Sequence, residues 1–348
     1  MDHIEVRQAW ERAARRAAAS GGAGRAAPSE LPELYPGVPT FMETPLATGP
    51  AELVGADVAV LGIPLHSNID SGVGRGPAAL RRQSRRYSLP RGLAHLPGGE
   101  GELIDLERLK IVDHGDVAVD GSAIETTYLR AHEKLADILA AGAVPLVLGG
   151  DHSVPIPVLQ VLSAKLSGKL GIVTFDSLFD LAFAPKYAAG SQWARAFELG
   201  VVEPSAFVQI GICGGRRPLL ERAVVDELGS TFFTVADVEE MGIAAVAQEA
   251  LELATTGTEA LYVSLDLAVL DAAAGGEARR EPAGLSAREL LRALDVVSRG
   301  RVAGVDICGL DPGLDRDGRL GRVAVRAAAG VLAGLSAQKS GNLPASPS

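Results

Sequence analysis

The sequence has few of the residues that build disulfide-rich or aromatic-rich proteins. Among its 348 residues, Cys213 and Cys308 are the only cysteines, and aromatic residues make up 4% of the chain. Two cysteines are too few for a disulfide framework, and they are wrongly spaced for a zinc ribbon. We therefore expect a core built from Ala, Val and Leu, in a protein of the reducing cytoplasm.

The chain also lacks an excess of positive charge and a long apolar run. It carries 33 Lys and Arg against 43 Asp and Glu, a net charge of −10, so no basic surface is expected to hold a nucleic acid. No segment reads as the roughly 20 apolar residues of a membrane span. Charged Asp2 and Glu5 stand where a signal peptide would be apolar. We expect neither a nucleic acid nor a membrane as a partner.

What the sequence does contain is a regular alternation of apolar strands and amphipathic helices, which predicts one large α/β domain with a mostly parallel, doubly wound sheet. The expected strands are 58–63, 144–148, 170–175, 206–212, 231–235, 260–265 and 301–307. The expected helices are 78–86, 128–141, 154–167, 243–256, 286–299 and 321–335. Residues 1–35 are interpreted as a helical appendage and linker, 36–335 as the domain and 336–348 as a disordered tail.

Four side chains that bind metals stand at the ends of predicted strands. His152 lies in the run Gly149-Gly150-Asp151-His152-Ser153, Asp176 and Asp180 follow the next strand, and Asp266 ends another. Because the carboxyl ends of parallel strands meet at one edge of the sheet, these side chains are expected to converge. One imidazole and three carboxylates form a ligand set for a hard or borderline divalent ion.

Structural alternatives exist for each of these residues. His152 could be a buried core histidine with its hydrogen bonds satisfied, and Asp176 and Asp180 could cap the turn that follows their strand. Asp271 is interpreted as a loop-capping residue and not as a ligand.

Several further segments carry a resemblance to a known family. They are Gly37–Phe41, Gly72–Pro77 with Leu80 and Arg81, Asp113–Val117, and the run Gly149–Ser153. In this order they resemble the ureohydrolase superfamily of arginases and agmatinases, most closely its agmatinase-like branch. The similarity runs from about Gly37 to Leu335.

The resemblance implies an arginase-like three-layer α/β/α sandwich with two manganese ions at the strand ends. In that family a hydroxide that bridges the two ions attacks a guanidinium carbon and releases urea. Carried over by motif, His152, Asp176, Asp180 and Asp266 match the full ligand set of one ion, with Asp176 and Asp266 in the bridging positions.

The second ion site of the family is not matched. The family motif Asp-Ala-His-x-Asp is here Asp176-Ser-Leu178-Phe-Asp180, so Leu178 replaces an imidazole ligand. The motif Ser-x-Asp-x-Asp is here Ser264-Leu-Asp266-Leu-Ala268, so Ala268 replaces a carboxylate ligand. We therefore expect one divalent ion per chain, Mn²⁺ or another.

Two residues that the family uses on its substrate are also replaced. Ala189-Gly-Ser-Gln-Trp193 aligns with His-Gly-Thr-Pro-Phe, so Ala189 stands in place of the proton-shuttling histidine. Gly309 stands where a glutamate would pair with the guanidinium. Cys308 is a candidate nucleophile or soft ligand beside that position, and Cys213 is a second thiol; the alternative for both is an inert cysteine.

Two functional hypotheses follow from this pattern. In the first, the chain is a single-metal hydrolase of a C–N bond in a small guanidino or amidino compound. Its catalytic residues are not identified by the sequence, with Asp266 and Cys308 as candidates. In the second, it is a catalytically silent paralogue that acts as a subunit or regulator of an active relative. The family assembles as trimers and hexamers, so a homo-oligomer or a hetero-oligomer is expected.

Overall fold

The computed structural model describes residues 39–66, 72–88, 95–97, 103–121, 123–183, 188–214, 218–275 and 281–339. The predicted appendage 1–35 lies outside these residues. The predicted disordered tail is partly corrected, because the last helix continues to Lys339, and the rest of the tail lies outside the described residues.

The centre of the structure is an eight-stranded sheet in the order β4-β1-β5-β10-β9-β6-β7-β8, in which every pair of neighbours is parallel. Its strands are β1 (Val58–Ile63), β4 (Ile111–Asp116), β5 (Val144–Gly149), β6 (Leu170–Phe175), β7 (Val202–Ile212), β8 (Thr231–Thr234), β9 (Ala260–Asp266) and β10 (Val302–Cys308). A separate antiparallel pair consists of β2 (His95–Pro97) and β3 (Leu103–Asp105).

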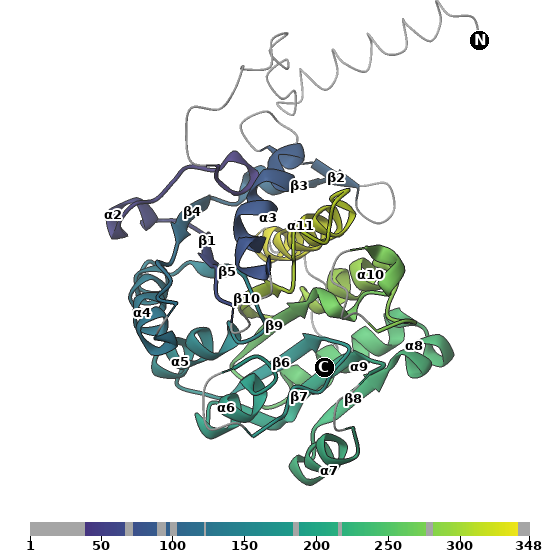
Figure 1. Cartoon of the computed structure of the whole chain (residues 1–348). Helices are drawn as coiled ribbons and strands as arrows, with labels where there is room; N and C mark the ends of the chain where they lie inside the picture. The colour runs from purple at the N-terminus through teal and green to yellow at the C-terminus, as the bar shows by residue number, and fades with distance from the viewer. Residues whose placement is uncertain are drawn as a thin grey trace, which may run out of the picture.

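Helices cover both faces of this sheet (Figure 1). They are α2 (Pro50–Leu53), α3 (Gly76–Ser84), α4 (Ile124–Ala140), α5 (Pro155–Lys165), α6 (Gln192–Glu198), α7 (Pro218–Leu228), α8 (Val235–Met241), α9 (Ile243–Thr255), α10 (Ala287–Val297) and α11 (Arg319–Lys339). One hydrophobic cluster joins the sheet to α3, α9, α10 and α11, and a second joins it to α4, α5 and α6. The predicted three-layer α/β/α sandwich is confirmed.

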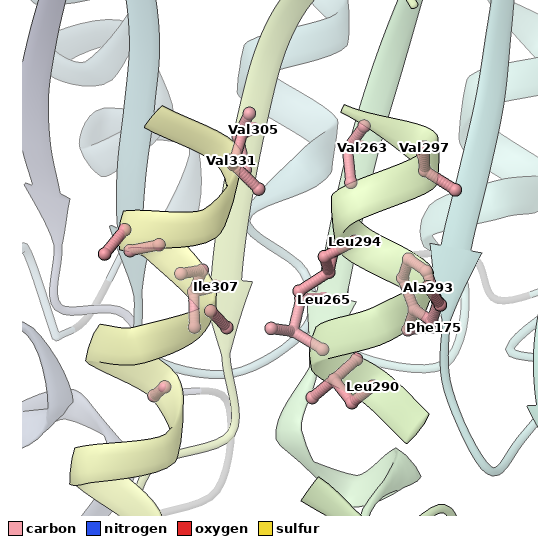
Figure 2. Packing of buried hydrophobic residues seen from close by; sticks show 14 of the residues in the cluster. Phe175, Val263, Leu265, Leu290, Ala293, Leu294, Val297, Val305, Ile307 and Val331 are labelled. Atoms are coloured by element: carbon pink, nitrogen blue, oxygen red, sulfur yellow. The ribbon is translucent and has the colours of Figure 1, made fainter. Parts of the chain in front are cut away.

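Alternate strand residues fill the two clusters, which explains why the strands are apolar without interruption. Val263 and Leu265 of β9 pack under α10, whereas Tyr262, the residue before Val263, belongs to the opposite cluster. Figure 2 shows Leu290 and Leu294 of α10 over these β9 residues. A strand that is buried on both faces has no polar positions to alternate with its apolar ones. Each such Leu or Val stabilises the fold by about 1.5–3 kcal/mol relative to an exposed side chain.

Two expectations about single elements were wrong. Helix α11 is by length and composition apolar enough to cross a membrane, contrary to the sequence-based statement that no segment is. However, 78% of its apolar window is buried inside the fold, as expected of a core helix. Val235, which was assigned to a strand, begins helix α8, because Thr234 accepts the Asp237 N–H as its N-cap.

The order of the strands indicates which edge of the sheet would bind a ligand. Strands β5, β10, β9 and β6 are consecutive neighbours at the centre of the sheet, although they are far apart in the sequence. In open parallel sheets, ligands bind outside the carboxyl ends of the strands at such a rearrangement of strand order. The four predicted ligand residues end or follow three of these strands, β5, β6 and β9.

Candidate metal centre

The structure brings the four predicted ligand residues together at the carboxyl edge of the sheet. His152 follows β5, Asp176 and Asp180 follow β6, and Asp266 is the last residue of β9. The Nδ1 atom of His152 lies 2.9 Å from Asp176 Oδ2 and 3.4 Å from the Oδ2 atoms of both Asp180 and Asp266. The predicted convergence is present, and the assignment of these residues as metal ligands stays a prediction.

The chemistry of this donor set fits one divalent cation. His152, Asp176 and Asp180 each offer a ligand atom, and these atoms lie within 4.8 Å of one another. The side chains of His152 and Asp176 are 2% exposed, and those of Asp180 and Asp266 are 13% and 14% exposed. Buried carboxylates in such proximity require a positive charge among them.

The acid–base properties of the cluster show the same demand for positive charge. Although burial disfavours the imidazolium, the bonds to Asp176 and Asp180 and the charge of Asp266 hold the pKa of His152 well above its usual value. Burial and the neighbouring charges of Asp180 and Asp266 raise the pKa of Asp176. The cluster therefore attracts either protons or a metal cation.

A second layer of hydrogen bonds orients His152. Its Nε2 atom lies 2.9 Å from Ser264 Oγ, and Ser264 in turn bonds to the buried carboxyl of Asp306. A metal-binding histidine commonly uses one ring nitrogen for the ion and the other for such a partner. Ser264, His152 and Asp176 also have the order of a catalytic triad, but Ser264 is fully buried, so no substrate reaches its hydroxyl.

The backbone at Asp180 is held in an unfavourable conformation. Its φ is 52°, in the left-handed region that residues with a Cβ seldom adopt. Strain of this kind persists where the surrounding structure fixes it, often at functional sites. Here it accompanies a carboxylate that faces His152 Nδ1.

The structure adds Gln192 to the site, a residue that the sequence analysis did not identify. Gln192 is the first residue of α6 and is fully buried. Its Nε2 atom lies 2.6 Å from Asp180 Oδ2 and 3.0 Å from His152 Nδ1. Burial by itself raises the pKa of Asp180, but the bonds from His152 and Gln192 lower it. A glutamine is not a usual ligand, so only the folded geometry reveals its place.

The two expected bridging carboxylates each turn their other oxygen towards the backbone. Asp176 Oδ1 accepts the Leu178 N–H at 3.1 Å, and Asp266 Oδ1 accepts the Ala268 N–H at 2.7 Å. Leu178 and Ala268 thus supply backbone donors at the positions where the family resemblance places ligands of a second ion. Their side chains have no atom that binds a cation.

Gly309 occupies a conformation that a glutamate would adopt only with strain. Its φ is +85°, and a Cβ built on it would clash with Asp266 Oδ1. Its N–H bonds to the carbonyl of Gly150 at 2.9 Å, which holds the β10 end against the loop that carries His152. Ala189, at the position where the family resemblance places a proton shuttle, is exposed and has no group that transfers a proton.

The geometry favours the inert interpretation of the two thiols. Cys308 is 1% exposed and its Sγ donates to Asp306 Oδ1 at 3.1 Å. Burial and the charges of Asp306 and Asp266 raise the pKa of Cys308 well above its usual value. Partial burial and nearby carboxylates raise the pKa of Cys213 to about 11. The thiolate is the nucleophilic form, and neither site favours it.

The loop role predicted for Asp271 is confirmed. Its two carboxylate oxygens accept the backbone N–H groups of Ala273 and Ala283, each at 2.7 Å. This bonding ties together the two ends of the segment that follows β9.

Comparison with known proteins agrees with this architecture. The model of the arginase family matches residues 56–334. The guanidinopropionase of Pseudomonas aeruginosa is 31% identical over 303 residues, which cover 83% of this chain and 89% of that relative. The chain is thus similar over most of its length to an amidinohydrolase.

Solved structures resemble the whole domain. A crystal structure of a hypothetical agmatinase from Burkholderia thailandensis has a TM-score of 0.76 at 26% identity and covers 88% of this chain and 93% of its own. Proclavaminate amidino hydrolase from Streptomyces clavuligerus has a TM-score of 0.75 at 27% identity and covers 87% and 98%. With a family match over most of its residues and the same fold, the chain belongs to the arginase family.

Proposed function

We propose that this chain is a metal-dependent hydrolase of a C–N bond in a small guanidino or amidino compound, and that it works with a single divalent ion. The observation that carries the proposal is the convergence of Asp176, Asp180 and Asp266 on Nδ1 of His152. A domain kept only as a scaffold has no need of three carboxylates in a buried cluster, because their desolvation is costly.

The residues on the side of the cluster away from His152 support the proposal that one ion binds, with Mn²⁺ as the expected metal. There Leu178 and Ala268 contribute only backbone N–H groups, and each of these is bonded to a carboxylate oxygen. A second cation at that side would have no ligand of its own beyond the shared Asp176 and Asp266.

The chain's own residues have two tasks in this reaction. Asp306 and Ser264 hold the imidazole of His152 so that Nδ1 faces the carboxylates. Asp176, Asp180 and Asp266 provide the negative charge that retains the cation. When bound, the ion supplies the activation of a water nucleophile.

The substrate is proposed to differ from arginine and agmatine. Gly309 has no carboxylate for a guanidinium, and Ala189 has no proton to give to a leaving amine. These two losses affect every guanidinium compound equally, so they do not choose among guanidino substrates. Because the relative from Pseudomonas aeruginosa is named a guanidinopropionase, short guanidino acids are the first compounds to examine.

A second candidate function is that of a silent subunit or regulator within an oligomer. It is favoured by the conformation of Gly309, since the clash of a Cβ with Asp266 means that the glutamate cannot be regained by a single substitution. In this case the cluster at His152 would hold a structural ion and no turnover would occur.

Urea release distinguishes the two functions. The purified protein, stripped with a chelator and reloaded with Mn²⁺, is assayed with guanidinopropionate, guanidinobutyrate, agmatine and arginine, beside a His152→Ala control. Turnover of a short guanidino acid near about 1 per second, a common enzymatic rate, that is lost in the control supports the hydrolase. No turnover of any compound, with metal still bound, supports the silent subunit.

A further inference from the structure

Gln192 lies where a cation would have to meet its ligands. Its Nε2 atom is within 3.0 Å of His152 Nδ1 and 2.6 Å of Asp180 Oδ2. These are the two ligand atoms that belong to the expected ion alone and are not shared as bridging ligands. Because His152 Nδ1 donates to the Asp176 carboxylate, the amide donates to Asp180 Oδ2 alone and uses a lone pair that an ion would need. Its nitrogen also fills the space beside Nδ1.

The orientation of the amide is fixed by its other end. Gln192 Oε1 accepts the Gly190 N–H at 2.8 Å, while Nε2 faces a carboxylate. If the amide were turned over, its NH₂ would face the Gly190 N–H and its oxygen would face Asp180, so both contacts would become repulsive. The hydrogen-bond network therefore assigns the nitrogen to the site and excludes Oε1 as a ligand in this arrangement.

The surroundings hold this side chain in place. Gln192 is fully buried at the start of α6, and the next residue, Trp193, packs edge-on against the His152 ring at a centroid distance of 5.6 Å. A buried amide with both ends bonded to polar partners leaves its position only if another group replaces its bonds.

We propose that Gln192 is a built-in competitor of the metal ion, and that it sets the metal affinity of this site. The inference rests on the proposed single-ion function. The amide stabilises the ion-free cluster by donating to Asp180, and the ion binds only when Gln192 leaves the space beside Asp180 Oδ2 and His152 Nδ1. Metal binding is accordingly weaker than the four ligand residues alone would give.

The test compares the stripped full chain with its Gln192→Ala and Gln192→Glu variants. Titration calorimetry gives the dissociation constant for Mn²⁺, and thermal unfolding is followed in chelator and in Mn²⁺. Gln160→Ala is the matched control, because the Gln160 amide bonds to His132 and not to a metal ligand.

Gln192→Ala is expected to bind Mn²⁺ at least about tenfold more tightly, since a hydrogen bond to a charged group is removed from the ion-free state. The same variant should unfold at a lower temperature in chelator and show a larger upward shift on adding Mn²⁺. Gln192→Glu, which replaces the donor by an oxygen ligand, should bind more tightly still. Gln160→Ala should leave the affinity unchanged.

The opposite results separate this inference from the proposed function. If wild type and both Gln192 variants bind Mn²⁺ equally, or the variants bind it more weakly, the competitor role is overturned and the single-ion site stands. If neither wild type nor any variant binds Mn²⁺, the single-ion site and the competitor role fall together. A loss of thermal stability that is the same with and without Mn²⁺ would mean a merely structural role and would also overturn the inference.

Discussion

The two sides of the candidate site differ in the side chains that they present. On one side His152 and Asp180 keep an imidazole and a carboxylate within 3.4 Å of each other. On the other side Leu178 and Ala268 present no side-chain ligand, although they stand only two residues away from Asp176 and Asp266. Asp176 and Asp266 themselves face His152 and belong to the first side.

The two oxygens of Asp176 and of Asp266 have different partners. Asp176 and Asp266 have one oxygen towards His152 and the other on a backbone N–H group. The backbone donors satisfy oxygens that would otherwise lack a partner in a buried place. Leu178 and Ala268 therefore leave no carboxylate oxygen of Asp176 or Asp266 without a partner, which is what the proposed single-ion site requires.

The largest effect is expected from neutralising Asp266, a carboxylate that stands between the two sides. Asp266→Asn keeps the shape of the side chain and its bond to Ala268, but it removes one negative charge beside His152. We expect Mn²⁺ affinity to fall on the order of a hundredfold or more, because even residues behind the ligands are worth tenfold to a hundredfold. Calorimetric titration of the stripped protein measures it, and an affinity within threefold of wild type would remove Asp266 from the site.

Side-chain ligands can be introduced on the side of the site that lacks them. In Leu178→His with Ala268→Asp, both absent ligands return while Asp176 and Asp266 already supply the shared oxygens. The metal content after mild dialysis should rise from about one ion per chain towards two, as elemental analysis would record. A content that stays at one, with the fold intact by circular dichroism, would show that this side of the pocket no longer accommodates an ion.

A substitution at Gly309 tests whether this position tolerates any side chain. Gly309→Ala forces a Cβ onto a φ of +85° and against Asp266 Oδ1, so we expect a loss of about 1–3 kcal/mol in stability and a smaller Mn²⁺-induced shift in the unfolding temperature. Gly257→Ala is the control, because its φ is +70° with no atom within 4 Å of an added Cβ. Equal losses of stability in the two variants, with equal Mn²⁺-induced shifts, would show that a Cβ at position 309 does not clash with Asp266.

The fold was largely predictable because its central strands are buried on both faces. Continuous apolar runs such as 170–175 mark such strands without ambiguity, and β6 has these same bounds. Strand β4 was missed because Asp113, His114 and Asp116 interrupt its apolar pattern. Its Asp113 is buried by pairing with Arg81, with Arg81 Nε 2.8 Å from Asp113 Oδ2, a compensation that no strand pattern expresses.

The candidate site was predictable where residue type alone indicates chemistry. His152, Asp176, Asp180 and Asp266 could be named from strand ends and motif. Gln192 could not, because its importance depends on a rotamer and on the donor at Gly190. The strain at Gly309 is likewise a property of the folded backbone, since the sequence reveals only that a glycine stands there.

The smallest effect on Mn²⁺ affinity is expected at Asp271, the next aspartate after Asp266 in the sequence. Asp271 carries the same group five residues further on, but its oxygens accept only the N–H groups of Ala273 and Ala283. In Asp271→Asn the amide oxygen keeps one of these bonds, so we expect a loss of about 1 kcal/mol in stability. The Mn²⁺ affinity should be unchanged, because neither bond involves a ligand residue. Thermal unfolding with and without Mn²⁺ separates the two quantities, and a fall in affinity as large as that of Asp266→Asn would mean that the ion is held by the loop after β9 and not by the strand ends.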